Sequence, residues 1–170
     1  GFASGYVEFE KQVQAMNLKV DYIFHATGTG GTMAGLAAGR KIAESDTKII
    51  SITVSPKDEK YLRKVEKLAN DVLALIKSPA HVTIEEDLHM DTGYYAPGYE
   101  QPNEAASEAI RLLARTEGLF VDPVYTGKAL AGLIDYVRSG KVPQGSNVVF
   151  WHTGGATALF AEREILGKLY

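Results

Sequence analysis

The sequence predicts an α/β fold, with a doubly wound, mostly parallel open sheet and helices on both faces. Two observations support this prediction. First, β-branched and aromatic runs at 20–24 and 47–54 flank an Ala- and Leu-rich stretch, and a strand, helix and strand at this spacing form a right-handed parallel crossover. Second, glycine-rich turns follow the first of these runs and a later apolar run at 147–151. Ligands of parallel sheets bind at the carboxyl ends of strands, so these turns stand where a binding site forms.

Length and composition limit the classes of protein to which the chain can belong. Its 170 residues fit a single domain over 1–170, and the absence of cysteine excludes a disulfide framework and a thiolate metal site. The net charge is -3 with scattered Lys and Arg, which gives no positive surface for nucleic acid or an anionic membrane. No apolar run is long enough to span a bilayer. We therefore expect a cytoplasmic protein that binds neither nucleic acid nor membrane.

The first half of the chain alternates helices and strands. Its predicted helices lie at about 5–16, 33–42 and 57–76, and its predicted strands lie at 20–24 and 47–54. Ser4 is a suitable N-cap for the first helix, in which Met16 is expected to be buried. Apolar residues of the third helix recur at steps of three and four, so its Lys and Glu residues are interpreted as a solvated face.

The second half begins with a long stretch without periodicity, 78–102, and loops of this length are usually functional or form an interface. Asn103 caps the next helix, which ends near Gly118. The remaining predicted elements are strands at 119–121 and 147–151 and helices at 128–139 and 156–169. Short loops at 122–127 and 152–155 precede the last two helices, so three loops, counting the glycine turn, are expected at the carboxyl edge of the sheet.

The glycine turn between the first strand and its helix has the composition of a phosphate-binding loop. Gly28, Gly30 and Gly31 let several backbone N–H groups converge on one anion, and Thr29 and Thr32 add hydroxyl donors. The dinucleotide fingerprint lacks its third glycine here, and no Gly-Lys pair is followed by the Ser or Thr of a P-loop. A cup for one phosphate group, as in a pyridoxal phosphate site, is favoured over a tight turn without a ligand.

Five stretches of the chain together resemble one enzyme family. They are GTGGTMAG at 28–35, GYEQPNE at 98–104, AIRLLARTEG at 109–118, DPVYTGK at 122–128 and HTGG at 152–155. From about Gly5 onward the chain is similar to the carboxy-terminal half of the D-cysteine desulfhydrase and 1-aminocyclopropane-1-carboxylate deaminase family, within the fold type II (tryptophan synthase β-like) pyridoxal phosphate enzymes. The glycine loop alone also resembles that of O-acetylserine sulfhydrylases, so the other stretches narrow the resemblance.

The resemblance implies that residues 1–170 are the carboxy-terminal, pyridoxal phosphate-binding portion of a longer enzyme. In the family, the lysine that forms the Schiff base with the cofactor lies in an amino-terminal half that this chain lacks. None of the lysines present matches its position, and the first residue is not an initiator Met, which indicates an internal cut. We therefore expect half of an active site, inactive alone and completed by the missing amino-terminal half, in an enzyme that forms a homodimer.

The resemblance also implies roles for individual residues. Tyr99 and Tyr125 match two active-site tyrosines, whose hydroxyls relay protons or position the substrate carboxylate. Thr126 and Thr153 are both candidates for facing the pyridine nitrogen, and Thr153 is favoured because it begins a glycine turn after a central strand. Gly154, the next residue of that turn, is expected to contact the cofactor too. The predicted phosphate cup consists of Gly28, Thr29, Gly30, Gly31 and Thr32.

The residue type at position 126 bears on the reaction. The deaminase branch has a glutamate there, which would keep the ring nitrogen of the cofactor protonated, whereas the threonine of this chain cannot. A neutral ring suits β-elimination of a thiolate better than the opening of a cyclopropane ring. We therefore expect the parent enzyme to act on a small amino acid, D-cysteine, and to release pyruvate, ammonia and sulfide.

Other functions stay open at this point. The parent enzyme could instead be a 1-aminocyclopropane-1-carboxylate deaminase or a cysteate sulfo-lyase. From another class, the chain could be a non-catalytic module that binds a phosphate or a partner chain through residues 78–102. The histidines lack the spacing of metal ligands, so no metal site is expected, and His152 is interpreted as a core histidine with satisfied hydrogen bonds.

Overall fold

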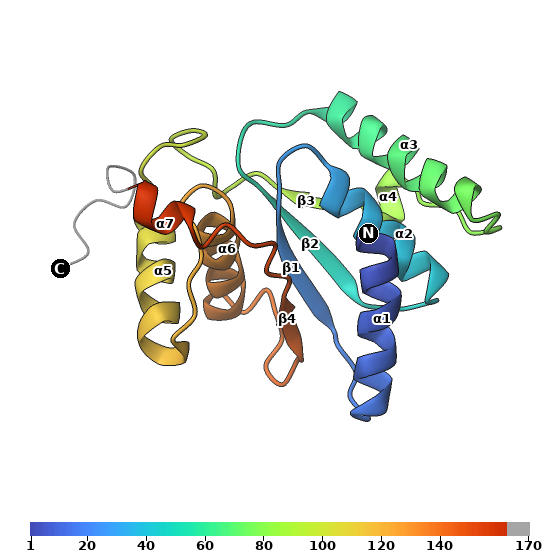
Figure 1. Cartoon of the computed structure of the whole chain (residues 1–170), viewed down its shortest axis with the longest axis horizontal. Coiled ribbons are helices and arrows are strands. Elements are labelled where there is room, and N and C mark those ends of the chain that lie inside the picture. Colours follow the sequence, from blue (N-terminus) through green and yellow to red (C-terminus); the bar gives the residue numbers. More distant parts are fainter. Residues whose placement is uncertain (163–170) are drawn as a thin grey trace.

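The structure, a computed structural model of the chain, describes residues 1–162 and contains a four-stranded sheet (Figure 1). The strands are β1 (Tyr22–Thr27), β2 (Lys48–Thr53), β3 (His89–Asp91) and β4 (Val148–Phe150). Their order is β3-β2-β1-β4, and each neighbouring pair is parallel. The predicted open parallel sheet is therefore confirmed.

Helices cover both faces of this sheet, as predicted. They are α1 (Phe2–Ala15), α2 (Gly31–Ile42), α3 (Glu59–Leu75), α4 (Ile84–Asp87), α5 (Glu104–Glu117), α6 (Thr126–Arg138) and α7 (Ala158–Ala161). In Figure 1, α1, α2 and α3 lie on one side of the sheet, and α5 and α6 lie on the other. Side chains of β1 alternate between the two layers: Ile23 belongs to a buried cluster with Tyr6 and Leu36, whereas Phe24 packs with Ala129 of α6. A strand covered on both faces does not alternate apolar and polar residues, which explains why β-branched and aromatic residues are clustered in these runs of the sequence.

The direction in which the sheet grows reverses at β1. On one side β1 pairs with β2, which follows it through α2, and on the other side it pairs with β4, the last strand within residues 1–162. A reversal of this kind opens a crevice outside the carboxyl ends of the two strands. The glycine turn after β1 and the glycine turn after β4 therefore meet at one edge of the sheet.

Three short elements differ from the prediction. The stretch 78–102, predicted as a loop, contains α4 and the edge strand β3, which pairs with residues 50–52 of β2. The residues of β3 are His, Met and Asp, so the β-branched signal of a strand is missing. Residues 119–121, predicted as a strand, instead connect α5 to α6, with Val121 buried among the helices and Leu119 56% exposed. An apolar run this short does not distinguish a strand from a buried connection.

Some helix ends differ from the prediction as well. The first helix begins at Phe2, so Ser4 is not its cap, and Met16 is 59% exposed just beyond its last residue instead of buried. The last helix was predicted over 156–169. The structure shows α7 within that range, and residues 163–170 lie outside the described residues.

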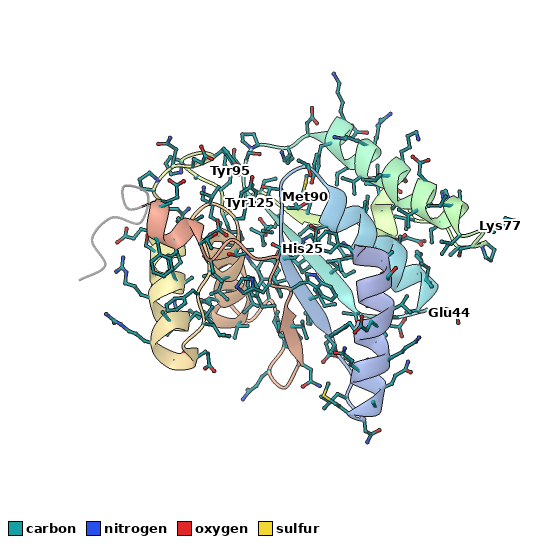
Figure 2. All side chains as sticks on the ribbon, viewed as in Figure 1. His25, Glu44, Lys77, Met90, Tyr95 and Tyr125 are labelled. Carbon is teal, nitrogen blue, oxygen red and sulfur yellow. The ribbon has the colours of Figure 1, made fainter. Side chains whose placement is uncertain are left out.

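Capping residues predicted the ends of one helix correctly. Asn103 accepts a hydrogen bond from the Ala106 N–H at the start of α5, and Gly118 ends the helix in the left-handed region. Glu44 and Lys77, labelled in Figure 2, follow the ends of α2 and α3 with φ of 51° and 57°. These two helices thus end near left-handed residues that are not glycine, and no glycine marks their ends in the sequence.

Candidate functional site

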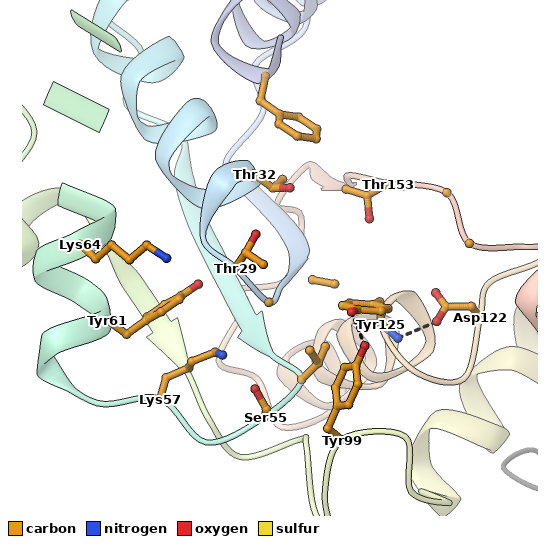
Figure 3. A pocket seen from close by; sticks show the side chains of 16 residues that line it. Thr29, Thr32, Ser55, Lys57, Tyr61, Lys64, Tyr99, Asp122, Tyr125 and Thr153 are labelled. Carbon is orange, nitrogen blue, oxygen red and sulfur yellow. Dashed lines mark hydrogen bonds between the residues drawn. The ribbon is translucent and has the colours of Figure 1, made fainter. Parts of the chain in front are cut away.

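A cavity of about 690 Å³ opens at the carboxyl edge of the sheet (Figure 3). Its walls come from the loops after β1, β2 and β4, from the starts of α1 and α2, from α3, from the segment before α5 and from the loop before α6. The lining residues are Phe2, Ala26, Gly28, Thr29, Thr32, Val54, Ser55, Lys57, Tyr61, Lys64, Tyr99, Asp122, Tyr125, Thr153, Gly154 and Gly155. The cavity therefore lies where doubly wound folds bind ligands.

The start of α2 forms one end of this cavity. Gly30 is the N-cap of α2 and has φ of 99°, a left-handed conformation that glycine adopts without strain. A Cβ atom on Gly30 would lie 2.7 Å from Cγ2 of Val65, so the contact with α3 also requires glycine. The first intrahelical bond runs from the Ala34 N–H to the Gly30 carbonyl, which leaves the earlier amides of the turn without helical partners. Such amides, with the positive end of the helix dipole, favour an anion.

Three threonine hydroxyls are available in the cavity. Thr29 and Thr32 stand beside the start of α2, and Thr153 stands in the loop after β4 (Figure 3). Within residues 1–162 none of these hydroxyls has a hydrogen-bond partner. They can therefore donate to a ligand without losing a bond inside the protein.

Tyr99 and Tyr125 form a hydrogen-bonded pair in the wall of the cavity. Their hydroxyl oxygens lie 2.5 Å apart, and their rings meet edge to face with centroids 5.7 Å apart. The hydrogen bond with Tyr125, with a smaller effect of burial, raises the pKa of Tyr99 to about 12. A Cβ atom on Gly28 would lie 3.2 Å from Cε1 of Tyr125, so the small residue of the glycine turn lets the ring approach. Because its pKa is raised, Tyr99 keeps its proton at neutral pH.

Asp122 organises the loop that carries Tyr125. Its Oδ2 accepts the N–H groups of Val124 and Tyr125, and its Oδ1 accepts both the N–H and the hydroxyl of Thr126. The Thr126 oxygen in turn accepts the Asp122 N–H at 2.9 Å. Thr126 is buried behind the cavity wall and its one hydroxyl proton is engaged, whereas Thr153 lines the cavity. Which threonine faces the ring nitrogen stays a prediction, and this arrangement favours Thr153.

His152 fixes the shape of the second glycine turn. Its Nδ1 accepts the Gly154 N–H at 3.0 Å, and its Nε2 lies 2.8 Å from the Phe120 carbonyl. Because a carbonyl only accepts, Nε2 carries the proton. The side chain has satisfied hydrogen bonds, as predicted, but it is exposed and is not a core histidine.

The cavity also contains basic residues that the sequence interpretation placed on a solvated face. Lys57 and Lys64 line it together with Tyr61, whose hydroxyl is 2.8 Å from Oγ1 of Thr27 at the end of β1. Lys57 Nζ lies 5.0 Å from the centre of the Tyr61 ring, and within the described part of the chain neither lysine forms an ion pair. The helical spacing of Tyr61 and Lys64 directly after the second strand was the available signal. This signal could not be distinguished in the sequence, because other Lys and Glu residues of α3 do face solvent.

The structure brings most of the predicted site residues together. Those that line the cavity are Gly28, Thr29, Thr32, Tyr99, Tyr125, Thr153 and Gly154. Gly30 and Gly31 begin α2 at its rim, and Thr126 lies behind the wall. Their roles toward a cofactor stay predictions.

Other features of the described residues bear on function. Within residues 1–162 no group of three or more His, Asp or Glu side chains could hold a metal ion. His25 is fully buried, and burial lowers its pKa to about 4, so it is neutral, donating from Nδ1 to the Ala26 carbonyl and accepting from the Ser51 hydroxyl. No helix in this part of the chain is long and apolar enough to cross a membrane.

Curated relatives match almost the whole chain. A 1-aminocyclopropane-1-carboxylate deaminase of Ralstonia nicotianae is 39% identical over 161 residues, which are 95% of this chain and 47% of the relative. A D-cysteine desulfhydrase of Yersinia enterocolitica is 41% identical over 165 residues, covering 94% of this chain and 48% of the relative. The chain thus spans about half the length of the curated relatives that it matches.

Solved structures and a family model agree with these relatives. The crystal structure of an ACC deaminase homologue is similar with a TM-score of 0.81 and 32% identity, over 96% of this chain and 49% of that one. A threonine deaminase structure, at 17% identity and a TM-score of 0.59, shows the shared fold. The model of the family described as pyridoxal-phosphate dependent enzyme matches residues 2–154. The chain therefore belongs to the pyridoxal-phosphate dependent enzyme family.

Proposed function

We propose that the complete protein, of which this chain is a part, is a pyridoxal phosphate-dependent enzyme that eliminates the β-substituent of a small amino acid. The proposed substrate is D-cysteine, and the products are pyruvate, ammonia and sulfide. One observation carries the proposal: the glycine cup, the unpaired Thr153 hydroxyl and the Tyr99–Tyr125 pair line the same cavity. The names of the relatives, 1-aminocyclopropane-1-carboxylate deaminase and D-cysteine desulfhydrase, support the reaction class.

The residues of the cavity fit pyridoxal phosphate by their chemistry. The first amides of α2 and the hydroxyls of Thr29 and Thr32 would hold the phosphate, and Lys57 and Lys64 would add positive charge. The Thr153 hydroxyl would face the ring nitrogen as a neutral partner. When bound, the cofactor supplies an electron sink for the charge that develops at the α-carbon of the substrate.

The two tyrosines would act at the substrate end of the cavity. Since the pKa of Tyr99 is about 12, its phenol remains protonated through the neutral range. The hydroxyl proton that is not used within the pair can therefore be donated in a hydrogen bond to the substrate carboxylate or to the departing sulfur.

The surroundings of Thr126 favour elimination over the opening of a cyclopropane ring. Its hydroxyl is bound to Asp122, and the Asp122 carboxylate is itself satisfied by donors of its own loop. No free carboxylate at this position would hold the ring nitrogen protonated, in contrast to the glutamate of the deaminase branch. A thiolate leaves readily without such a strong electron sink, which supports D-cysteine, or cysteate as a related substrate, over 1-aminocyclopropane-1-carboxylate.

The context of the chain is part of the proposal. We infer that residues 1–170 form the carboxy-terminal, cofactor-binding portion of this enzyme and that an amino-terminal half supplies the lysine that binds the cofactor. The chain covers about half of its curated relatives, which supports this division. A homodimer in the cytoplasm stays a prediction.

A comparison of substrates tests the proposal. The complete protein, loaded with cofactor, is assayed with D-cysteine, 1-aminocyclopropane-1-carboxylate and cysteate, with ammonia as the common product. We expect the largest kcat/KM with D-cysteine, accompanied by sulfide and pyruvate. A larger value with 1-aminocyclopropane-1-carboxylate would show a deaminase instead. Tight cofactor binding without turnover of any of the three would favour a non-catalytic module.

A further inference from the structure

Lys128 is fully buried in the first turn of α6, although lysine seldom is. Its Nζ donates to the Gly98 carbonyl at 2.7 Å and to the Tyr95 carbonyl at 3.3 Å. Both carbonyls belong to the segment that carries Tyr99. Tyr125 stands just before α6, as its N-cap residue. The amine therefore connects α6 to the backbone immediately before a predicted active-site tyrosine.

The same segment is held from its other end by Asn103. The Asn103 Nδ2 donates to the carbonyls of Ala96 and Tyr94, at 2.6 and 3.1 Å, while its Oδ1 caps α5. Residues 94–98 thus lie between a cap of α5 and the buried amine of α6. This segment is neither helix nor strand, so these bonds from side chains define its path.

We propose that Lys128 is a positioning residue, which holds Gly98 so that the hydroxyl of the next residue, Tyr99, meets Tyr125. This inference rests on the proposed function, in which the tyrosine pair faces the substrate. Tyr99 is 42% exposed, its ring meets the ring of Tyr125 edge to face, and its hydroxyl also interacts with the neighbouring Glu100. Lys128 does not line the cavity, in contrast to Lys57 and Lys64, and acts through the loop.

The chemistry of the buried amine is consistent with this role. Burial lowers the pKa of Lys128, and the nearby Asp122 carboxylate opposes that change. An amine in such a place needs acceptors, and the two backbone carbonyls provide them. Without the amine, both carbonyls would lose a donor, and the segment would move toward water to recover one.

The first test measures position and is independent of cofactor and substrate. In the full chain with isotopically labelled tyrosines, NMR cross-peaks between the rings of Tyr99 and Tyr125 are recorded at neutral pH. We expect Lys128→Met to abolish these cross-peaks and Lys128→Arg, which keeps donors, to preserve them. Arg138→Met is the matched control, because Arg138 ends the same helix in an exposed ion pair with Glu108. Lys128→Gln, a milder change with a shorter reach, should weaken the cross-peaks.

The second test separates positioning from general stability. In the complete enzyme, Lys128→Met should lower kcat for β-elimination by about a hundredfold, the scale expected for misplacing an active-site group by about 1 Å. In a Tyr99→Phe background, the same substitution should have little further effect, because the hydroxyl that it positions is already absent. Equal losses in both backgrounds, or cross-peaks that persist in folded Lys128→Met, would overturn the proposal. If Lys128→Met loses the cross-peaks but the wild-type complete protein has no elimination activity, the positioning role of Lys128 is supported and the proposed function is rejected.

Discussion

Glycine at position 30 determines both the backbone and the packing of the predicted phosphate cup. Gly30→Val places a β-branched residue at φ of 99° and a Cβ 2.7 Å from Val65. The converging amides would move, so we expect the affinity of the complete protein for pyridoxal phosphate to fall by more than about tenfold. Spectroscopic titration with the cofactor measures the change. Gly5→Ala is the control, because Gly5 lies in α1 outside the cup and a Cβ there would lie 3.6 Å from the Trp151 ring, an ordinary van der Waals distance. Unchanged affinity in Gly30→Val would show that the loop is only a turn.

The two candidate threonines are expected to respond differently to loss of the hydroxyl. Thr126→Val removes the bonds to Asp122 from a buried position and should lower the free energy of unfolding by about 1–3 kcal/mol. Thr153→Val changes an exposed residue without a partner in residues 1–162, so stability should stay within about 0.5 kcal/mol. The second substitution should instead lower sulfide release by the complete enzyme. Denaturant unfolding and sulfide assays on both variants check this contrast, and a reversed pattern would exchange the two roles.

A charged residue at position 126 probes the electronics of the cofactor. Thr126→Glu buries a second carboxylate beside Asp122, where repulsion and desolvation oppose it. We expect slower elimination from D-cysteine in the complete enzyme, measured as sulfide release, both because the protonation of the cofactor ring would change and because an extra carboxylate would be buried. Release at the wild-type rate would remove Thr126 from the chemistry and leave Thr153 as the candidate.

At the scale of residues, the sequence predicted the types that chemistry requires but not their internal partners. The glycines and threonines of the cup could be recognised because they lie within five consecutive positions after a strand. The bond between Thr126 and Asp122 could not be assigned, since a threonine four residues after an aspartate can face either a cavity or its own loop. The burial of Lys128 was equally hidden, because it depends on a segment thirty residues away.

At the scale of elements, α4 is held to α2 by the buried carboxylate of Asp87. Asp87 accepts the Thr83 N–H, and it pairs with Lys41 and with Arg40. Burial alone would raise the pKa of Asp87, but the hydrogen bond from Thr83 and the two cations lower it below its usual value. The pKa of Asp87 is lower in the folded state than in the unfolded state. This stabilisation is therefore complete above the unfolded-state pKa of about 3.9 and is lost as the pH falls through the folded-state pKa.

The prediction for Asp87 follows from that sign. Asp87→Asn should be less stable than the wild type at neutral pH, and the difference should narrow below about pH 4. Urea unfolding across pH measures it. Asp71→Asn is the control, because Asp71 forms an exposed pair with Lys67 on α3 and should change little at any pH. A constant difference down to low pH would contradict the role of the charge.

The elements themselves were predictable in proportion to their periodicity. The strands at the centre of the sheet and the capped helix α5 have strong local signals. The edge strand β3 and the short α4 depend on tertiary contacts, namely pairing with β2 and the ion pairs of Asp87, which no local pattern reveals. For the same reason residues 119–121, apolar but not paired in a sheet, were predicted wrongly.

At the scale of the molecule, the convergence of the glycine turns after β1 and β4 on one cavity could be predicted from the order of elements, whereas the loop 122–127 reaches the cavity without the strand predicted before it. Parallel strands bring their carboxyl ends to one edge, and the switch between β1 and β4 marks the crevice. The contribution of α3 and of the residues just before it could not be predicted. The approach of Lys57 and Lys64 to the cavity depends on how α3 packs against α2. The cavity is consequently more basic than the sequence suggested.

This basic cavity leads to a prediction for the chain of 170 residues by itself. An anion on oriented amides needs no covalent lysine, so we expect weak binding of phosphate or pyridoxal phosphate. Turnover of D-cysteine should be absent, because the chain lacks a lysine matching the family's position, and its buried Lys128 is bound to loop carbonyls. Lys57 and Lys64 line the cavity, and we expect pyridoxal phosphate to modify each of them only partially.

Reductive trapping measures this outcome directly. The isolated chain is mixed with pyridoxal phosphate and reduced with borohydride, modified lysines are located by mass spectrometry, and sulfide release is followed in parallel. The complete protein, treated identically, should show one lysine outside residues 1–170 modified in proportion to its activity. Stoichiometric modification of a single lysine within the chain, together with sulfide release, would overturn the claim that its active site is incomplete. Lys57→Gln and Lys64→Gln would then identify which of the cavity lysines had taken that role.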